Sequence, residues 1–335
     1  MNARALPPRR TRPAAVAAAV RGALALLVLA LTHGIASAQS WPARTVRIIV
    51  PLTAGSNADL LARAVAQGLS TQLGQSFIVE NRPGGDGTIG VSVVAKGAPD
   101  GYSVLVHTSS FTVSPSTHAS LPYDTVNDFA GITSLGFTPL VMIMSPDKGL
   151  RTVQEVVKAA KARPGSMNYA SAGSAGQLNS ERFRISAGFE GTHVPFKGSP
   201  EAITEVMTGR IDYYFCPVSP VLGYIREGKL LALAIGSSKR SSSLPDVPTT
   251  IEAGYPNSDY TFWTGMFVPK KTPRTVVDRL YQETARALHS PDVTERLTRL
   301  GIEPMPLTPE QTDRLIRDEI ESNALLVKAA GIQVN

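Results

Sequence analysis

Residues 52–59 are mostly small or polar, which is the composition of an anion-binding loop. The apolar run before them ends at Pro51, and apolar residues resume at helical spacing from Leu60. Ser56 or Asn57 could cap this helix, and Asp59 would place a negative charge in its first turn. Free backbone N–H groups at such a helix start bind anions, although a plain turn without a ligand is the alternative. The candidate binding residues of this first loop are Leu52, Thr53, Ala54, Gly55, Ser56, Asn57 and Asp59.

Residues 171–177 form a second stretch of this composition, again after an apolar segment. Small hydroxyl residues and glycines again lead into a helical pattern, so backbone N–H groups would again be free at the helix start. Two such loops facing each other across a cleft could hold the two ends of a dianion; two unrelated turns are the alternative. The candidate binding residues of this second loop are Ser171, Ala172, Gly173, Ser174, Gly176 and Gln177.

Two weaker candidate contacts follow other apolar segments. The hydroxyl groups of Thr108, Ser109 and Ser110 could reach a ligand, or they could only cap a turn. Cys216, the only cysteine, stands beside Pro217. A lone cysteine in this position is expected in a binding-site wall or in the core rather than as a nucleophile.

Residues 85–90 match the pattern G-x-G-x-x-G, which is typical of dinucleotide-binding folds. In those folds the glycines directly follow a strand, but here Asn81, Arg82 and Pro83 intervene. No acidic residue stands about 20 positions further on to bind a ribose. The sequence therefore predicts no nucleotide cofactor.

No motif in the chain assembles a catalytic or metal-binding group. Neither G-x-S-x-G nor H-E-x-x-H occurs, and the histidines have no paired spacing. An enzyme acting on a carboxylate would need a base, for which Asp59 and His107 are the candidates. Asp59 is more simply explained as a first-turn helix charge and His107 as a strand-end residue. We therefore expect no catalysis, no metal and no cofactor.

Residues 1–38 have the pattern of a cleaved export signal. The segment contains five arginines and no acid, and its apolar run at 23–31 is too short for a membrane anchor. Ala36-Ser37-Ala38 then provides the small residues before a cleavage site, which predicts a periplasmic protein. The pair Arg9-Arg10 leaves export by the general or the twin-arginine route open.

The basic charge of the full chain comes mostly from this segment. The chain has 33 Lys and Arg against 27 Asp and Glu, a net charge of +6. Without the five arginines of the signal, 28 basic residues face 27 acidic ones. The charge therefore gives no reason to expect binding to nucleic acid or to an anionic membrane.

Short apolar strands alternate with helical patterns through most of the remaining chain, which favours α/β units with helices on both faces of each sheet. A strand expected at 260–269 would return to the first part of the structure. The sequence predicts two lobes, each with a mainly parallel sheet, two crossing segments and a ligand in the cleft. The expected division is 41–140 and 260–335 for the first lobe and 141–259 for the second.

The chain contains several short motifs, in the same order, that resemble those of one known family. This family is the periplasmic solute-binding proteins of tripartite tricarboxylate transporters, also called the Bug or TctC family. The resemblance covers essentially all of residues 41–332. The matching segments are 41–51, Val79–Gly85 (VENRPGG), Ala98–Tyr102 (APDGY), Leu121–Asp124 (LPYD), Asn168–Gly173 (NYASAG), Val194–Gly198 (VPFKG) and Leu244–Thr249 (LPDVPT).

This resemblance implies a Venus-flytrap fold that captures a carboxylate in its cleft, with Phe196 among the ligand contacts. It also implies delivery of the ligand to two integral membrane permease subunits, by a protein expected to be a monomer. A sensing protein that docks to a receptor in the same closed form is the alternative, and the sequence does not separate the two.

Three departures from the family pattern bear on the ligand. The first loop lacks the family's usual prolines and extra glycines, and the second is shorter, with Gln177 where a histidine is common. Cys216 stands where the family often has an aspartate that could bind an ammonium group. The resemblance therefore makes an α-amino acid less expected and leaves room for a bulkier diacid, including an aromatic one.

Overall fold

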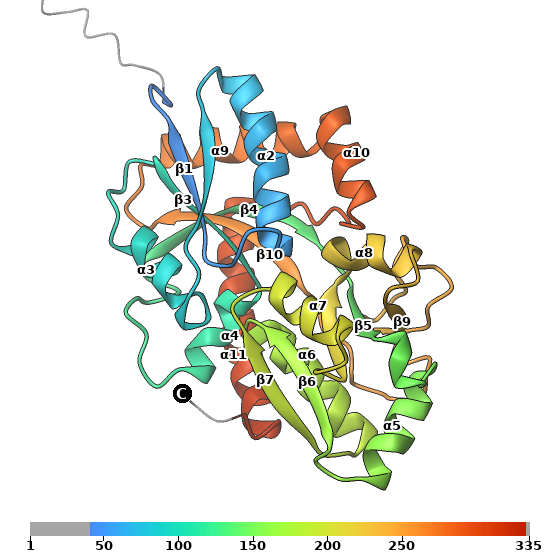
Figure 1. The fold of residues 1–335 in the computed structure, drawn as a ribbon. Helices are drawn as coiled ribbons and strands as arrows, with labels where there is room; N and C mark the ends of the chain where they lie inside the picture. Colours follow the sequence, from blue (N-terminus) through green and yellow to red (C-terminus); the bar gives the residue numbers. More distant parts are fainter. Residues whose placement is uncertain (1–40, 333–335) are drawn as a thin grey trace, which may run out of the picture. The chain divides into compact units, whose positions relative to one another are not determined.

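The computed structural model describes residues 41–332, and the chain from Arg44 onward forms one compact unit (Figure 1). The export signal expected at residues 1–38 lies outside the described residues. None of the helices within 41–332 combines the length and apolarity needed to cross a membrane.

The first sheet has the strand order β2-β1-β3-β10-β4. Strands β2, β1 and β3 are parallel, and β10 runs antiparallel to both of its neighbours. The strands are β1 (Val46–Val50), β2 (Phe77–Asn81), β3 (Ser103–Thr108), β4 (Phe129–Phe137) and β10 (Trp263–Pro269). The helices of this lobe are α2 (Asn57–Leu73), α3 (Thr88–Ala95), α4 (Ser110–Thr117), α9 (Arg274–Leu288), α10 (Pro291–Arg299) and α11 (Pro309–Ala329), with the short η1 (Gly85–Gly87).

The second sheet has the order β7-β6-β8-β5-β9, in which β5 is the strand antiparallel to its neighbours. Its strands are β5 (Leu140–Met144), β6 (Met167–Ala172), β7 (Gly191–Phe196), β8 (Tyr213–Pro217) and β9 (Leu231–Ile235). The helices are α5 (Val153–Ala162), α6 (Ser174–Ala187), α7 (Ser199–Met207) and α8 (Val218–Arg226), with the short η2 (Pro146–Lys148).

The chain passes between the sheets twice, from β4 to β5 and from β9 to β10 (Figure 1). In each sheet, the strand that enters from the other sheet occupies the fourth place and runs opposite to the other four. The predicted two-lobe α/β fold is therefore confirmed, with mainly parallel sheets that each contain one antiparallel strand. The expected strand at 260–269 begins at Trp263, and α4 was not predicted because Pro115 interrupts its pattern.

The strands at the centre of each sheet are mostly buried because helices cover both faces. All residues of β8 and β10 are buried. Aromatic side chains fill the space between sheet and helices, with Phe111, Trp263 and Phe267 in the first lobe. Tyr169, Phe183, Tyr213 and Phe215 have this place in the second. These cores fix the strand ends from which the loops of the site emerge.

Gly90 explains why the chain has a glycine pattern without a dinucleotide fold. A Cβ at this position would lie 2.8 Å from the carbonyl oxygen of Arg82 and 2.8 Å from Pro51 Cβ. The last glycine of the pattern therefore allows α3 to pack directly on the chain after β1 and β2. Its role is close packing, the same physical role that such a glycine has in nucleotide-binding folds.

Replacing Gly90 with alanine is expected to destabilise the protein by about 1–3 kcal/mol, because the added methyl group meets backbone that has no room to move. The matched control is Gly223→Ala in α8, where a Cβ would meet nothing within 4 Å. There alanine should stabilise by about 0.5–1 kcal/mol through helix propensity. Melting temperatures of both variants test this pair, and equal shifts would contradict the packing argument.

Candidate functional site

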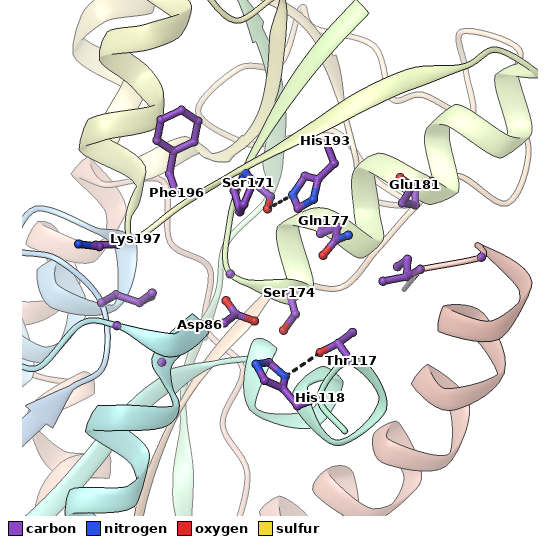
Figure 2. Close-up of a pocket in the computed structure, with 17 residues that line it drawn as sticks. Asp86, Thr117, His118, Ser171, Ser174, Gln177, Glu181, His193, Phe196 and Lys197 are labelled. Atoms are coloured by element: carbon purple, nitrogen blue, oxygen red, sulfur yellow. Dashed lines mark hydrogen bonds between the residues drawn. The ribbon is translucent and has the colours of Figure 1, made fainter. Parts of the chain in front are cut away.

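A cavity of about 510 Å³ lies between the two lobes. Figure 2 shows polar side chains from both lobes directed into it, among them Asp86 and His118 from the first lobe and Ser174 and Gln177 from the second. The lining residues are Leu52, Gly84, Asp86, Gly87, Thr117, His118, Ser171, Gly173, Ser174, Gln177, Glu181, His193, Pro195, Phe196, Lys197, Gly331 and Ile332.

The N-terminus of α6 is the centre of this cavity wall. Gly173 precedes the helix with φ of 92°, and no side chain of the preceding residue caps its first N–H groups. The first lobe provides partners instead, because the N–H of Ala175 donates to Ser110 Oγ at 3.1 Å. Ser174 Oγ also donates to the carbonyl oxygen of Ser110 at 3.4 Å. The helix start, which favours negative charge, thus contacts the opposite lobe at the edge of the cavity.

The two lobes also meet where the first loop approaches the start of α7. A Cβ at Gly198 would lie 1.8 Å from Thr53 Oγ1, so only glycine permits this approach. Gly55 lies nearby, since a Cβ there would be 3.4 Å from Pro200. The lobes of this structure are therefore in direct contact on one side of the cavity.

Ser171 and His193 form a hydrogen-bonded pair on the second-lobe side. Ser171 Oγ lies 2.7 Å from His193 Nε2, and the imidazole stacks on Tyr169 with ring centroids 5.3 Å apart. Burial lowers the pKa of His193, against a smaller raising effect from Glu181. When Nε2 of the neutral ring carries the proton, it donates a hydrogen bond to Ser171 Oγ, and the Ser171 hydroxyl can then donate to a ligand carboxylate.

Glu181 lines the cavity with its charge already matched. Tyr169 donates its phenolic proton to the carboxylate, and Arg184 forms an ion pair with it at 2.6 Å. The desolvation of Tyr169 and its bond to this acid both raise the tyrosine pKa. Glu181 is thus held by its own lobe.

Asp86 enters the cavity on a glycine-rich loop with an unusual backbone. All four residues from Gly84 to Gly87 have positive φ, and Asp86 itself has φ of 51°. Gly87 packs on the buried His107, whose Nε2 would lie 3.2 Å from a Cβ at Gly87. Burial lowers the pKa of His107 to about 3, so its ring is neutral at pH 7. The loop therefore packs on an uncharged imidazole ring and places Asp86 in the cavity wall.

The electrostatics of Asp86 differ from those of Glu181. Burial raises the pKa of Asp86 to about 6, while the nearby His118 and hydrogen bonds from Ser174 act in the opposite direction. His118 Nδ1 is in turn 3.2 Å from Thr117 Oγ1. Neither Asp86 nor His118 was among the residues predicted from the sequence. The only available signal was an acid within a run of glycines.

Six of the residues expected at the site line the cavity: Leu52, Ser171, Gly173, Ser174, Gln177 and Phe196. The others lie elsewhere. Ala54 of the first loop, Ala172 at the end of β6 and Gly176 in the first turn of α6 are not part of the lining, and Thr108 and Ser109 are buried at the end of β3. Ser56 is buried just before α2. Thr53, Gly55 and Ser110 take part in the contacts between lobes described above.

Asn57 connects the lobes away from the cavity. Its amide donates to Thr264 Oγ1 at 3.2 Å, and its carbonyl oxygen accepts from Ser219 Oγ of α8 at 2.8 Å. All three side chains are buried. This chain of hydrogen bonds joins α2, β10 and α8.

Asp59 and Cys216 do not line the cavity and contact other parts of the protein instead. Asp59 accepts hydrogen bonds from the N–H of Gly55 at 2.9 Å and from Asn81 at 3.0 Å, and it pairs with Arg63. It therefore shapes the first loop from within. Cys216 is buried in the core of the second lobe, where desolvation raises its thiol pKa. Within residues 41–332, no group of three or more His, Cys, Asp and Glu side chains is placed to hold a metal ion.

A family model and a related protein both match most of this chain. The family model described as "Tripartite tricarboxylate transporter family receptor" matches residues 61–332. The Protein BugT of Bordetella pertussis is 36% identical over 310 residues, which cover 90% of this chain and 95% of BugT.

Two solved structures of bacterial proteins resemble this chain in both sequence and fold. The R. palustris protein Rpa4515, solved with adipate, is 31% identical with a TM-score of 0.84, over 88% of this chain and 99% of that protein. MatC from Rhodopseudomonas palustris, with bound malate, is 30% identical with a TM-score of 0.81, over 86% and 100% of the two chains. With matches of this extent in sequence and structure, the chain belongs to the TctC family of tripartite tricarboxylate transporter receptors.

Proposed function

We propose that this protein is a periplasmic solute-binding protein that captures a small carboxylate, most simply a dicarboxylate, between its two lobes. It then delivers this ligand to the two membrane permease subunits of a tripartite tricarboxylate transporter. The observation that carries the proposal is the cavity at the N-terminus of α6, which is lined from both lobes. Family membership and the adipate and malate bound by similar proteins support it.

The chemistry of the second loop suits a carboxylate. Ser171, Ser174 and Gln177 bring neutral hydroxyl and amide donors to the cavity, and Lys197 adds one exposed cation at its edge. A hydrogen bond to a charged group contributes roughly 1.5–3 kcal/mol. Four or five such bonds, less the cost of ordering ligand and lobes, correspond to about 8 kcal/mol, or micromolar affinity.

Binding and delivery would be linked through the relative position of the lobes. A ligand that touches both lobes stabilises the arrangement in which they meet, as Ser110 and Ala175 do here. The permease would recognise that arrangement. The lobe boundaries near residues 140 and 260, the monomeric state and the export signal remain predictions of this proposal.

No catalytic role is proposed for the Ser171–His193 pair. A hydrolase would need an acid that orients the imidazole, as in a triad. Glu181 is the acid in the cavity on this side, and it is engaged by Tyr169 and Arg184. The pair is better suited to bind a carboxylate than to attack a carbonyl group.

Calorimetric titration of residues 39–335, stripped of bound ligand by unfolding and refolding, tests the proposal. The panel contains citrate, succinate, adipate, glutamate, phthalate and terephthalate, so that aliphatic and aromatic acids are compared. We expect saturable one-to-one binding of at least one diacid with a dissociation constant in the micromolar range or below, by the energies given above. Correctly folded protein that binds none of them would contradict carboxylate capture.

The amide of Gln177 is expected to contribute directly to affinity. Gln177→Met keeps the length of the side chain and its helix propensity but removes the donor, so the best diacid should bind at least tenfold more weakly, about 1.4 kcal/mol. The matched control is Gln282→Met, an exposed position on α9 away from the cavity. Equal affinity of the two variants would show that Gln177 does not contact the ligand.

A further inference from the structure

Asp86 gives the cavity an acid on which, within residues 41–332, a histidine of its own lobe acts rather than an arginine or lysine. The charge of the other cavity acid, Glu181, is matched by Arg184 at 2.6 Å. The positively charged group that acts on Asp86 is the imidazole of His118, which carries a full charge only when it is protonated. Figure 2 shows the Asp86 side chain beside Ser174 and His118 in the pocket.

The carboxylate of Asp86 lies at the helix start that would bind a ligand carboxylate. Its Oδ1 is 3.8 Å from the place of a Cβ on Gly173, and Ser174 of the helix start acts to lower its pKa against the larger raising effect of burial. Asp86 comes from the first lobe and Ser174 from the second. The first lobe therefore already supplies one anion to the N-terminus of α6.

The backbone indicates that this position is imposed by the fold. Asp86 has φ of 51°, a conformation that most residues with side chains avoid and that aspartate and asparagine tolerate best. Glycines on both sides permit this conformation, and Gly87 packs on the neutral ring of His107. The acid is therefore placed before any ligand arrives.

We propose that Asp86 determines which carboxylates this cavity prefers: those that carry a hydrogen-bond donor, an ammonium or hydroxyl group, close to a carboxylate. The inference rests on the proposed carboxylate-binding function. A diacid without a donor must bring its second charge near Asp86, where like charges repel. A diacid with a donor gives Asp86 a partner, and an ammonium group also compensates its charge.

The presence of Cys216 where the family often has an aspartate made an α-amino acid ligand less expected. That reasoning concerns only the second lobe, where Cys216 is buried in the core. Asp86 provides the missing acceptor from the opposite lobe. An amino or hydroxy acid thereby finds an acidic partner across the cavity.

The test compares succinate, malate and aspartate, which differ at one carbon by hydrogen, hydroxyl and ammonium. Adipate and 2-aminoadipate form a second pair for a longer site. Dissociation constants are measured by calorimetry at pH 7.5 for the ligand-stripped wild type, Asp86→Asn and Asp246→Asn. Asparagine keeps the shape and tolerates the positive φ, and Asp246 is an exposed acid outside the cavity.

We expect the wild type to bind the amino diacid at least tenfold more tightly than its unsubstituted partner, with malate between them. Asp86→Asn should reduce this preference to less than threefold, and Asp246→Asn should retain it. The ratio between ligands is the readout, because any effect of the substitution on contact between the lobes acts on all ligands alike. Asp86→Gly, which also suits the positive φ, should behave like Asp86→Asn.

The outcomes separate the two proposals. Binding of diacids without a donor preference, or a preference that Asp86→Asn leaves unchanged, would overturn the role of Asp86 and leave carboxylate capture standing. Failure of every carboxylate to bind would overturn the proposed function and with it the inference.

Discussion

The N-terminus of α6 is the point on which the arrangement of this protein depends. Its first N–H groups have no capping side chain, because glycine occupies the preceding position. Such groups require partners, and here Ser110 and Asp86 of the other lobe face them. A helix start without a cap on one lobe is thereby a reason for the two lobes to meet, and for an anion to lie between them.

Close approach of backbone at a few glycines makes this meeting possible. Gly198 admits the hydroxyl of Thr53, and Gly173 lies so near Ser110 that a Cβ would be 2.7 Å from its Oγ. Gly90 plays the corresponding role within the first lobe, where it seats α3 on the chain after β1. At these two points the contact between lobes is made of small residues, Thr53 with Gly198 and Ser110 with Gly173.

The charges in the cavity follow a simple division. Glu181 is neutralised within its lobe, the neutral His107 supports a loop, and the serines and Gln177 donate without carrying charge. Asp86 differs from Glu181, because burial raises its pKa and the charged group that acts on it is a histidine, His118. Ligand chemistry can act on Asp86, since a group that arrives there changes the balance of charge.

The sequence by itself determined the α/β character, the two lobes and four residues of the second loop that line the cavity, because strand and helix patterns and loop composition are local properties. It also indicated the family through motifs in the right order. Tertiary structure alone decided that Asp59 bonds within its own loop, that Cys216 lies in the core and that Asp86 reaches the cavity. The physical reason is that these outcomes depend on contacts between residues far apart in the chain, such as Asp86 and Ser174, which the two crossings bring together.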